Sequence, residues 1–246
     1  MDISVLQAHL LPALAICFAA FMQGITGFGL VIIAAPLLMM FYDPKQAVLI
    51  MFIVALITGV VQTLMVWREA RYRLIGTILI GYIAAQPFGY WIFANFSATQ
   101  LKLLVSTILL LSLLLMQFTH HHFALNLRNS VLMGFFSGIC GVTTGMAGPP
   151  LILYFAYTAL KPNELRSTSV VFFLFSGLIS VGFFLLNGVT MKPAFMESLY
   201  LLPAMLLGLL LARAIIRYVS VKLFRFLIFF MLYFICAYMF YSLLAA

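Results

Sequence analysis

A run of residues without a single charge, from Leu10 to Tyr42, is interrupted in its middle by the glycine-rich stretch Gln23-Gly24-Ile25-Thr26-Gly27-Phe28-Gly29. About fifteen apolar residues precede this stretch and about thirteen follow it, whereas a helix needs about 20 residues to cross ~30 Å of hydrocarbon. In a bilayer, the backbone groups that glycines expose must line a cavity or be covered by protein. We therefore predict a helical hairpin over residues 8–42, with its tip inside the membrane and Pro36 kinking its second arm.

Composition makes a membrane the expected surroundings of this hairpin. Hydrophobic residues make up 66% of the 246 residues and charged residues 7%, with a mean hydropathy of +1.21, whereas soluble domains carry about 25% charged residues. The chain is thus predicted to be an all-α polytopic membrane protein embedded in the lipid bilayer. The net charge of +8 comes from short loops between apolar runs, so we do not expect nucleic-acid binding.

The glycine stretch has a second copy, Gly138-Ile139-Cys140-Gly141-Val142-Thr143-Thr144-Gly145-Met146-Ala147-Gly148-Pro149-Pro150. Gly24, Gly27 and Pro36 match Gly138, Gly141 and Pro150 at one constant offset of 114 residues. Two copies half a chain apart indicate an internal duplication.

The apolar runs divide the chain into two repeats. The first, residues 1–119, contains the hairpin 8–42 and spans at 46–67, 74–94 and 101–118. A polar connector over 120–130 carries His120-His121-His122, which we interpret as a solvated linker because adjacent residues on a helix point in different directions. The second repeat, residues 131–246, contains the hairpin 131–160 and spans at 167–186, 193–212 and 223–244.

The distribution of basic residues predicts the orientation. If each hairpin returns to its starting side, each repeat has three full spans and the repeats are inverted. Ten basic residues then lie in the cytoplasm and three outside, which agrees with the positive-inside rule. Both termini are then periplasmic. The cytoplasmic set is Arg68, Arg71, Arg73, Arg128, Lys161, Arg166, Arg213, Arg217, Lys222 and Arg225, and the outer set is Lys45, Lys102 and Lys192.

Inverted hairpins that enter from opposite faces bring their tips together near the midplane, where transporters with inverted repeats commonly bind substrate. The second arms begin near Leu30 and Pro149, and a helix N-terminus favours an anion. The sequence therefore predicts a carrier for a small anion. The predicted substrate-binding residues are Gln23, Gly24, Thr26, Gly27, Phe28, Gly29, Cys140, Gly141, Thr143, Thr144, Gly145, Gly148 and Pro149.

Close helix packing is the competing interpretation of the glycines, because small residues let helix backbones approach in membranes. Gln62, Gln86, Ser176 and Ser180 either line the path or form hydrogen bonds between helices. Among the acidic residues, Glu197 is the nearest candidate for proton coupling, and its alternative is an interfacial side chain that reaches toward water.

Gly24-Ile-Thr-Gly27-Phe-Gly29 with Pro36-Leu37-Leu38, repeated as Gly138-Ile-Cys-Gly141 with Pro149-Pro150-Leu151, resembles the sulfite exporter TauE/SafE family of membrane permeases. The resemblance covers nearly the whole chain. It implies transport of sulfite, sulfoacetate or a related sulfur-containing anion across the bacterial inner membrane.

Two alternatives stay open from the residues alone. One is a transporter of another small solute or of a soft metal bound by Cys140 and Met146. The other is a membrane assembly protein that transports nothing. No paired acids, Ser/His, Cys/His or metal-ligand pattern lies at membrane depth, so we expect neither an enzyme, nor a cofactor, nor a bound metal.

Overall fold

The computed structural model describes residues 3–26, 30–118, 124–156, 158, 160–215, 233, 237 and 241. All regular structure in these residues is helical, which confirms the predicted all-α class. The helices of the first half are α1 (Ile3–Thr26), α2 (Leu30–Leu38), α3 (Pro44–Val66), the 3-10 turn η1 (Trp67–Glu69), α4 (Tyr72–Asn95) and α5 (Ala98–Phe118). Those of the second half are α6 (Leu127–Thr144), α7 (Gly148–Ala156), α8 (Pro162–Leu186) and α9 (Lys192–Ile215). The tip residues Gly27, Phe28 and Gly29, and the span expected at 223–244 apart from positions 233, 237 and 241, lie outside the described residues.

Four of the described helices are long and apolar enough to cross a membrane, at Pro44–Glu69, Tyr72–Asn95, Asn163–Leu186 and Lys192–Ala214. Large apolar side chains on their outer faces are exposed, for example Leu64 at 74% and Leu186 at 87%. Soluble proteins rarely expose so large an apolar surface to water, so these faces indicate contact with lipid. The chain is a polytopic membrane protein.

Local chemistry accounts for where several helices begin and end. The Asp43 carboxylate accepts a hydrogen bond from the backbone N–H of Lys45 at 2.9 Å, and Pro44 occupies the first turn of α3, where its missing N–H costs nothing. The Asn126 side chain caps α6 by accepting from the N–H of Asn129 at 2.8 Å. Gly145, with φ of 76°, ends α6 in the left-handed conformation that glycine adopts without a Cβ clash.

The arms of the two hairpins are unequal. Helix α1 has 24 residues and α2 has nine, and the apolar part of α1, His9–Gly24, is shorter than the four helices that are long and apolar enough to cross. The expectation that each arm is too short to cross stays a prediction. Helix geometry continues from Ile3 through His9, beyond the apolar residues from which the arm was counted. In the second hairpin α6 has 18 residues and α7 has nine.

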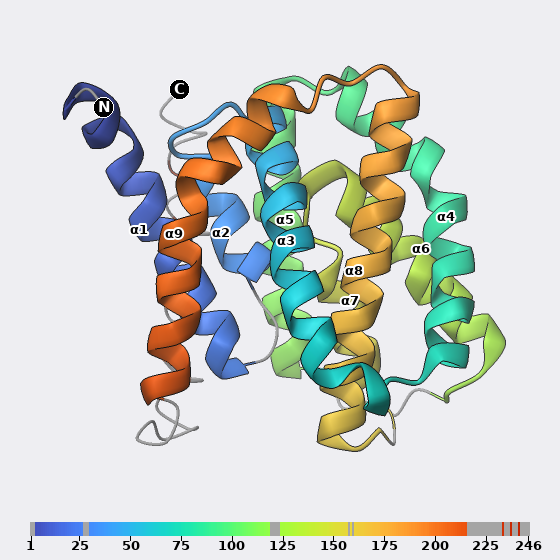
Figure 1. The fold of residues 1–246 in the computed structure, drawn as a ribbon. Helices are drawn as coiled ribbons and strands as arrows, with labels where there is room; N and C mark the ends of the chain where they lie inside the picture. The colour runs from blue at the N-terminus through green and yellow to red at the C-terminus, as the bar shows by residue number, and fades with distance from the viewer. Residues whose placement is uncertain are drawn as a thin grey trace.

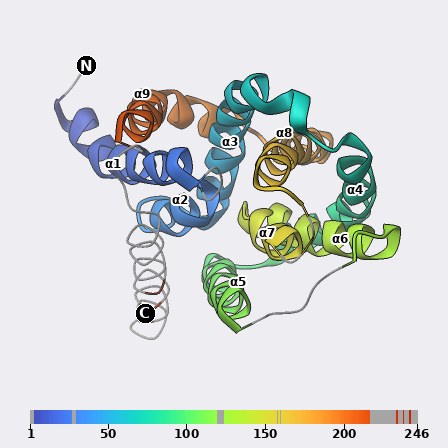
Figure 2. The same cartoon turned by 90° about the horizontal axis from the view of Figure 1, so that it is seen from below.

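Helices α3 and α8 pack against each other in the middle of the molecule (Figure 2). The pair α1–α9 lies on one side of them and the pair α4–α6 on the other. Helices α3 and α8 run in opposite directions, as do α4 and α9 (Figure 1). Corresponding helices of the two halves therefore point opposite ways in this central part of the fold.

The α1–α9 pair and the α4–α6 pair cross in the same way. A Cβ on Gly208 would overlap the carbonyl oxygen of Cys17 and come within 3.0 Å of the nitrogen of Phe21. A Cβ on Gly81 would overlap the carbonyl oxygen of Val131 and come within 2.8 Å of the nitrogen of Phe135. Cys17 and Val131 are 114 positions apart, and so are Phe21 and Phe135. The offset seen in the glycine motifs thus recurs in the packing of the helices that carry them.

Candidate functional site

A cavity of about 70 Å³ lies between α3 and α8 and is also lined by residues of both hairpins. By the same measure one water molecule needs roughly 10–15 Å³, so the cavity has room for about five water-sized groups. The lining residues are Gln23, Leu30, Val31, Ile32, Phe52, Ala55, Thr58, Gly59, Gln62, Tyr82, Gly145, Ala147, Gly148, Ile152, Val170, Phe173, Ser176 and Gly177. The wall is mostly apolar, with a few polar groups, as in small-molecule sites generally.

The two central helices contribute equivalent positions to this wall. Phe52, Ala55, Thr58 and Gly59 of α3 lie 118 positions before the α8 lining residues Val170, Phe173, Ser176 and Gly177, respectively. The helix contacts follow the same offset, since a Cβ on Gly59 would meet Leu174 at 3.5 Å and one on Gly177 would meet Leu56 at 3.0 Å. The cavity therefore lies at the contact between α3 and α8, to which the two halves of the chain contribute equivalent positions.

Three predicted site residues line the cavity: Gln23, Gly145 and Gly148. They come from the end of α1, the end of α6 and the start of α7. Of the four path candidates, Gln62 and Ser176 also line it. The hairpins and the central helices thus bring residues that are far apart in sequence to one place.

Two carboxamides meet in the cavity wall. The Nε2 of Gln23 donates to the Oε1 of Gln62 at 3.3 Å, and the Oε1 of Gln23 is buried without a partner. A buried amide oxygen without a hydrogen bond costs about 1–3 kcal/mol. This oxygen fits a water or a ligand group that donates a hydrogen bond to it.

Tyr82 is a lining residue that the sequence motifs did not indicate. Its ring is fully buried, and its hydroxyl shares a hydrogen bond with Ser180 at 2.8 Å. Gln86 donates to the carbonyl of Tyr82 at 3.3 Å and keeps a buried, unpartnered Oε1. Ser180 and Gln86 therefore form hydrogen bonds with Tyr82, and neither of them lines the cavity.

The remaining predicted residues of the second copy lie beside the cavity. Thr143 and Thr144 are fully buried, and their hydroxyls donate to carbonyls one turn earlier in α6, at 2.7 Å to Ile139 and 2.6 Å to Cys140. A hydroxyl that is used in this way has no proton left for a ligand. Cys140, Gly141 and Pro149 are likewise not among the residues that line the cavity. Their role in binding stays a prediction.

Gly24 contacts α9 rather than the cavity. A Cβ on Gly24 would overlap the Cβ of Ala212, and the equivalent Gly138 would bring a Cβ within 2.6 Å of Ala85. These contacts fit the packing interpretation of the motif glycines. The side chain of Thr26 and all of Gly27, Phe28 and Gly29 lie outside what the structure describes.

The soft-metal alternative finds little support at this cavity. Met146 is fully buried and Cys140 partly buried, yet neither is among the lining residues.

Charged pairs lie near the ends of the helices, away from the cavity wall. Glu197 accepts a hydrogen bond from the Tyr42 hydroxyl at 3.1 Å, and its carboxylate lies 3.3 Å from the Nδ1 of His9. Burial raises the pKa of Tyr42, and the Glu197 carboxylate raises it further, so the hydroxyl keeps its proton and donates. Glu197 is thus held by α1 and by the turn between α2 and α3.

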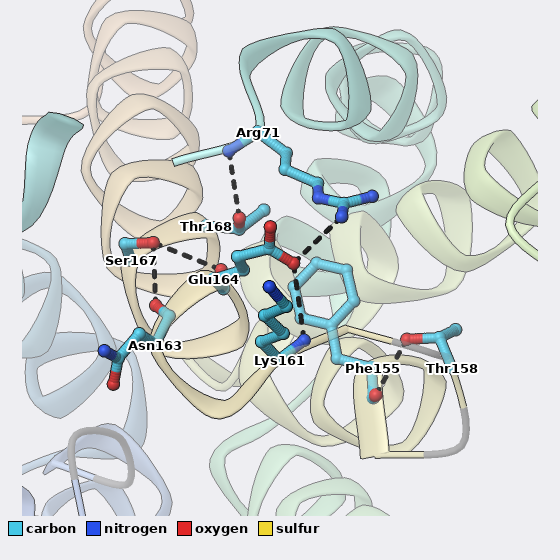
Figure 3. A network of polar contacts seen from close by, with 8 residues as sticks. All are labelled: Arg71, Phe155, Thr158, Lys161, Asn163, Glu164, Ser167 and Thr168. Atoms are coloured by element: carbon cyan, nitrogen blue, oxygen red, sulfur yellow. Dashed lines mark hydrogen bonds and ion pairs between the residues drawn. The ribbon is translucent and has the colours of Figure 1, made fainter. Parts of the chain in front are cut away.

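A second network joins the starts of α4 and α8 (Figure 3). The Arg71 guanidinium donates to the Glu164 carboxylate at 2.9 Å, and the Arg71 backbone N–H donates to Thr168 at 3.1 Å. The same Glu164 oxygen accepts from the backbone N–H of Lys161 at 3.3 Å. These contacts link α4 to α8 at the end of the molecule opposite to Glu197.

Comparison with known proteins gives one family. Residues 12–239 match the family model described as sulfite exporter TauE/SafE. No curated protein and no solved structure matches the chain.

Proposed function

Because this chain belongs to the sulfite exporter TauE/SafE family of membrane transporters, we propose that it moves a small sulfur-containing anion, such as sulfite or sulfoacetate, across the bacterial inner membrane. The observation that carries this proposal is the cavity between α3 and α8, whose wall combines equivalent positions of both halves with residues of both hairpins. Transporters built from inverted repeats bind substrate at such a place.

We further propose that the two halves are inverted repeats that alternate access to this cavity. The opposite directions of α3 and α8, and of α4 and α9 (Figure 1), support this. The crossing shared by the α1–α9 and α4–α6 pairs supports it as well. In this mechanism one pair rocks against the α3–α8 centre to open the cavity to one side, and the other pair opens it to the other side.

Substrate contacts in this proposal come from neutral donors. The carboxamides of Gln23 and Gln62 provide N–H groups, and the start of α7 at Gly148 adds backbone N–H groups and a partial positive charge. Leu30 begins α2 at the same cavity. The predicted contacts of Gly27, Phe28 and Gly29 belong to the same proposal.

The orientation proposed from charge places the Arg71–Glu164 end in the cytoplasm. Arg68, Arg71, Lys161 and Arg166 lie at that end, around the η1 turn and the start of α8. Among the described residues, the opposite end carries Lys45, Lys102 and Lys192, near the starts of α3, α5 and α9. This bias follows the positive-inside rule and leaves the Glu197 end in the periplasm.

Flux measurements in proteoliposomes test the proposal. Purified protein is assayed with radiolabelled sulfite and sulfoacetate under an imposed membrane potential. We expect flux that follows the potential and falls at least about tenfold in Gln62→Leu, because the substrate loses a hydrogen bond to a charged group.

Gln46→Leu is the matched control. It makes the same change on the same helix at a residue that does not line the cavity, so we expect flux close to that of the unchanged protein. Folded protein that moves neither anion above empty liposomes would refute the proposed function. Equal flux in Gln62→Leu and Gln46→Leu would refute the proposed cavity as the binding site.

A further inference from the structure

The described residues of the cavity wall include no ionised side chain. Among the described residues that line it, the polar ones are Gln23, Thr58, Gln62, Tyr82 and Ser176, and none is an acid, a lysine, an arginine or a histidine. The Arg71–Glu164 ion pair and the contact between His9 and Glu197 lie near helix ends, outside the lining residues. A ligand in the cavity therefore meets no neutralising charge among the described residues of its wall.

Most hydroxyl protons of the wall are already used. The Thr58 hydroxyl donates to the carbonyls of Val54 and Ala55 at 2.8 and 3.0 Å. The Ser176 hydroxyl donates to the carbonyl of Phe173 at 3.1 Å, and the Tyr82 hydroxyl is paired with Ser180. A hydroxyl has one proton, so Thr58 and Ser176 have none left for an anion.

The side-chain donors that remain are the two carboxamides and, if Ser180 donates in the shared hydrogen bond, the Tyr82 hydroxyl. In the Gln23–Gln62 pair the donating amide keeps one N–H and the accepting amide keeps both, whichever of the two donates. The first turn of α7 adds few backbone donors, because Pro149 and Pro150 follow Gly148 and have no N–H. The wall thus offers a small number of neutral donors.

Few neutral donors favour a low charge. The cost of taking an ion out of water rises as the square of its charge, about fourfold from one charge to two in the Born description. Hydrogen bonds from neutral groups offset that cost for one delocalised charge far better than for two, and the two helix starts contribute only partial charges. The volume of about 70 Å³ adds a preference for a compact ion.

Resting on the proposed anion transport, we propose that this cavity selects compact, singly charged sulfur oxyanions and rejects doubly charged ones. Hydrogensulfite and small monosulfonates belong to the selected class. Sulfite dianion, sulfate and sulfoacetate at neutral pH, which carry two charges, belong to the rejected class, so this inference removes sulfoacetate from the proposed substrates and keeps sulfite in its singly charged form. The charge of the ligand is the property that the wall recognises.

Competition between ions of fixed charge tests this. Flux of labelled sulfite into proteoliposomes is measured with methanesulfonate, which carries one charge, or sulfate, which carries two, as competitor at the same pH. We expect methanesulfonate to compete at least about tenfold more strongly. We also expect sulfite flux to increase as the pH falls through the second ionisation of sulfite, while flux of labelled methanesulfonate stays constant.

A variant that introduces a positive charge provides the second arm. Gln62→Lys places a cation in the wall and is expected to change the competition ratio in favour of sulfate by about tenfold or more. Gln62→Met, similar in size and uncharged, is expected to keep the ratio of the unchanged protein while its flux falls. The ratio is measured within each variant, so a lower amount of folded protein does not affect it.

Binding measured without transport separates the two proposals. The thermal stabilisation of the detergent-purified protein is compared between methanesulfonate and sulfate. Flux of sulfite with equal competition by sulfate and methanesulfonate would overturn the charge selection and leave the transport function intact. Absence of all anion flux would overturn the proposed function, and absence of preferential stabilisation by methanesulfonate would then overturn charge selection as well.

Discussion

Replacing Gly81 by alanine tests the helix crossing that the two halves share. The new Cβ would overlap the carbonyl oxygen of Val131 and lie 2.8 Å from the nitrogen of Phe135. Both are backbone atoms of α6, so no side-chain rotation relieves the overlap and the helices must move apart. Overpacking of this kind typically costs about 1–3 kcal/mol.

Gly76→Ala on the same helix is the matched control, because a Cβ there meets nothing within 4 Å. Both substitutions gain the same helix propensity, up to about 1 kcal/mol. The difference between the two variants therefore isolates the crossing, and we expect Gly81→Ala to be less stable than Gly76→Ala by about 1–3 kcal/mol.

The assay is reversible unfolding of the purified protein in mixed micelles with increasing fractions of denaturing detergent, followed by circular dichroism. Gly208→Ala gives an internal replicate, because its Cβ would overlap the carbonyl oxygen of Cys17 in the same way. Equal unfolding midpoints for Gly81→Ala and Gly76→Ala would refute the close crossing of α4 and α6.

Three further predictions use other features of the molecule. Gly145 and Gly188 both have φ of 76°, so alanine at either should lower the free energy of unfolding by about 1–2 kcal/mol. Only Gly145→Ala, which alters the cavity wall, should also lower the flux per folded molecule. Equal loss of flux in both variants would contradict this. Tyr42→Phe removes the hydroxyl that donates to the carboxylate on α9 at 3.1 Å and should reduce stability by roughly 0.5–3 kcal/mol, the upper part of the range applying to charged acceptors; an unchanged midpoint would show that this bond contributes nothing. In a background without the native cysteines, Ser97→Cys should react with an impermeant thiol reagent added to intact cells and Asn163→Cys should not, because the proposed orientation puts them on opposite sides of the membrane; the reverse labelling would invert that orientation.

Part of the candidate site was predictable from the glycine motif alone. Gly145 and Gly148 were found in this way, and both line the cavity, where one ends α6 and the other begins α7. The motif also predicted Thr143 and Thr144 as site residues, and their hydroxyls donate hydrogen bonds to carbonyls of their own helix. Proximity in sequence does not distinguish these two cases, because successive residues of a helix face different directions.

Other lining residues were not predictable from the hairpin motif. Thr58, Gly59 and Gly177 belong to spans that resemble ordinary apolar helices in sequence, whereas Ser176 in the same spans was a path candidate. Their recurrence at an offset of 118, which differs from the hairpin offset of 114, is a signal that alignment of the two spans could have revealed. Tyr82 has no such partner signal and enters the wall only because α4 packs beside α6 and α8.

The sequence by itself determined the class of the protein and the places where its helices break. Long uncharged runs can be stable only as helices in a bilayer, since helices satisfy their own backbone hydrogen bonds there. The glycines and prolines that interrupt those runs act locally, as Gly145 does at the end of α6. These properties depend on neighbouring residues, and a sequence displays neighbouring residues directly.

Only the tertiary structure decided which glycines pack helices and which line the cavity. Gly24 and Gly145 occur in copies of one motif, yet Gly24 meets Ala212 of α9 while Gly145 faces the space between α3 and α8. The pairing of Gln23 with Gln62, 39 residues apart, has the same origin. Such contacts depend on how helices cross, and a crossing is set by the shapes of two surfaces that the chain brings together only when it folds.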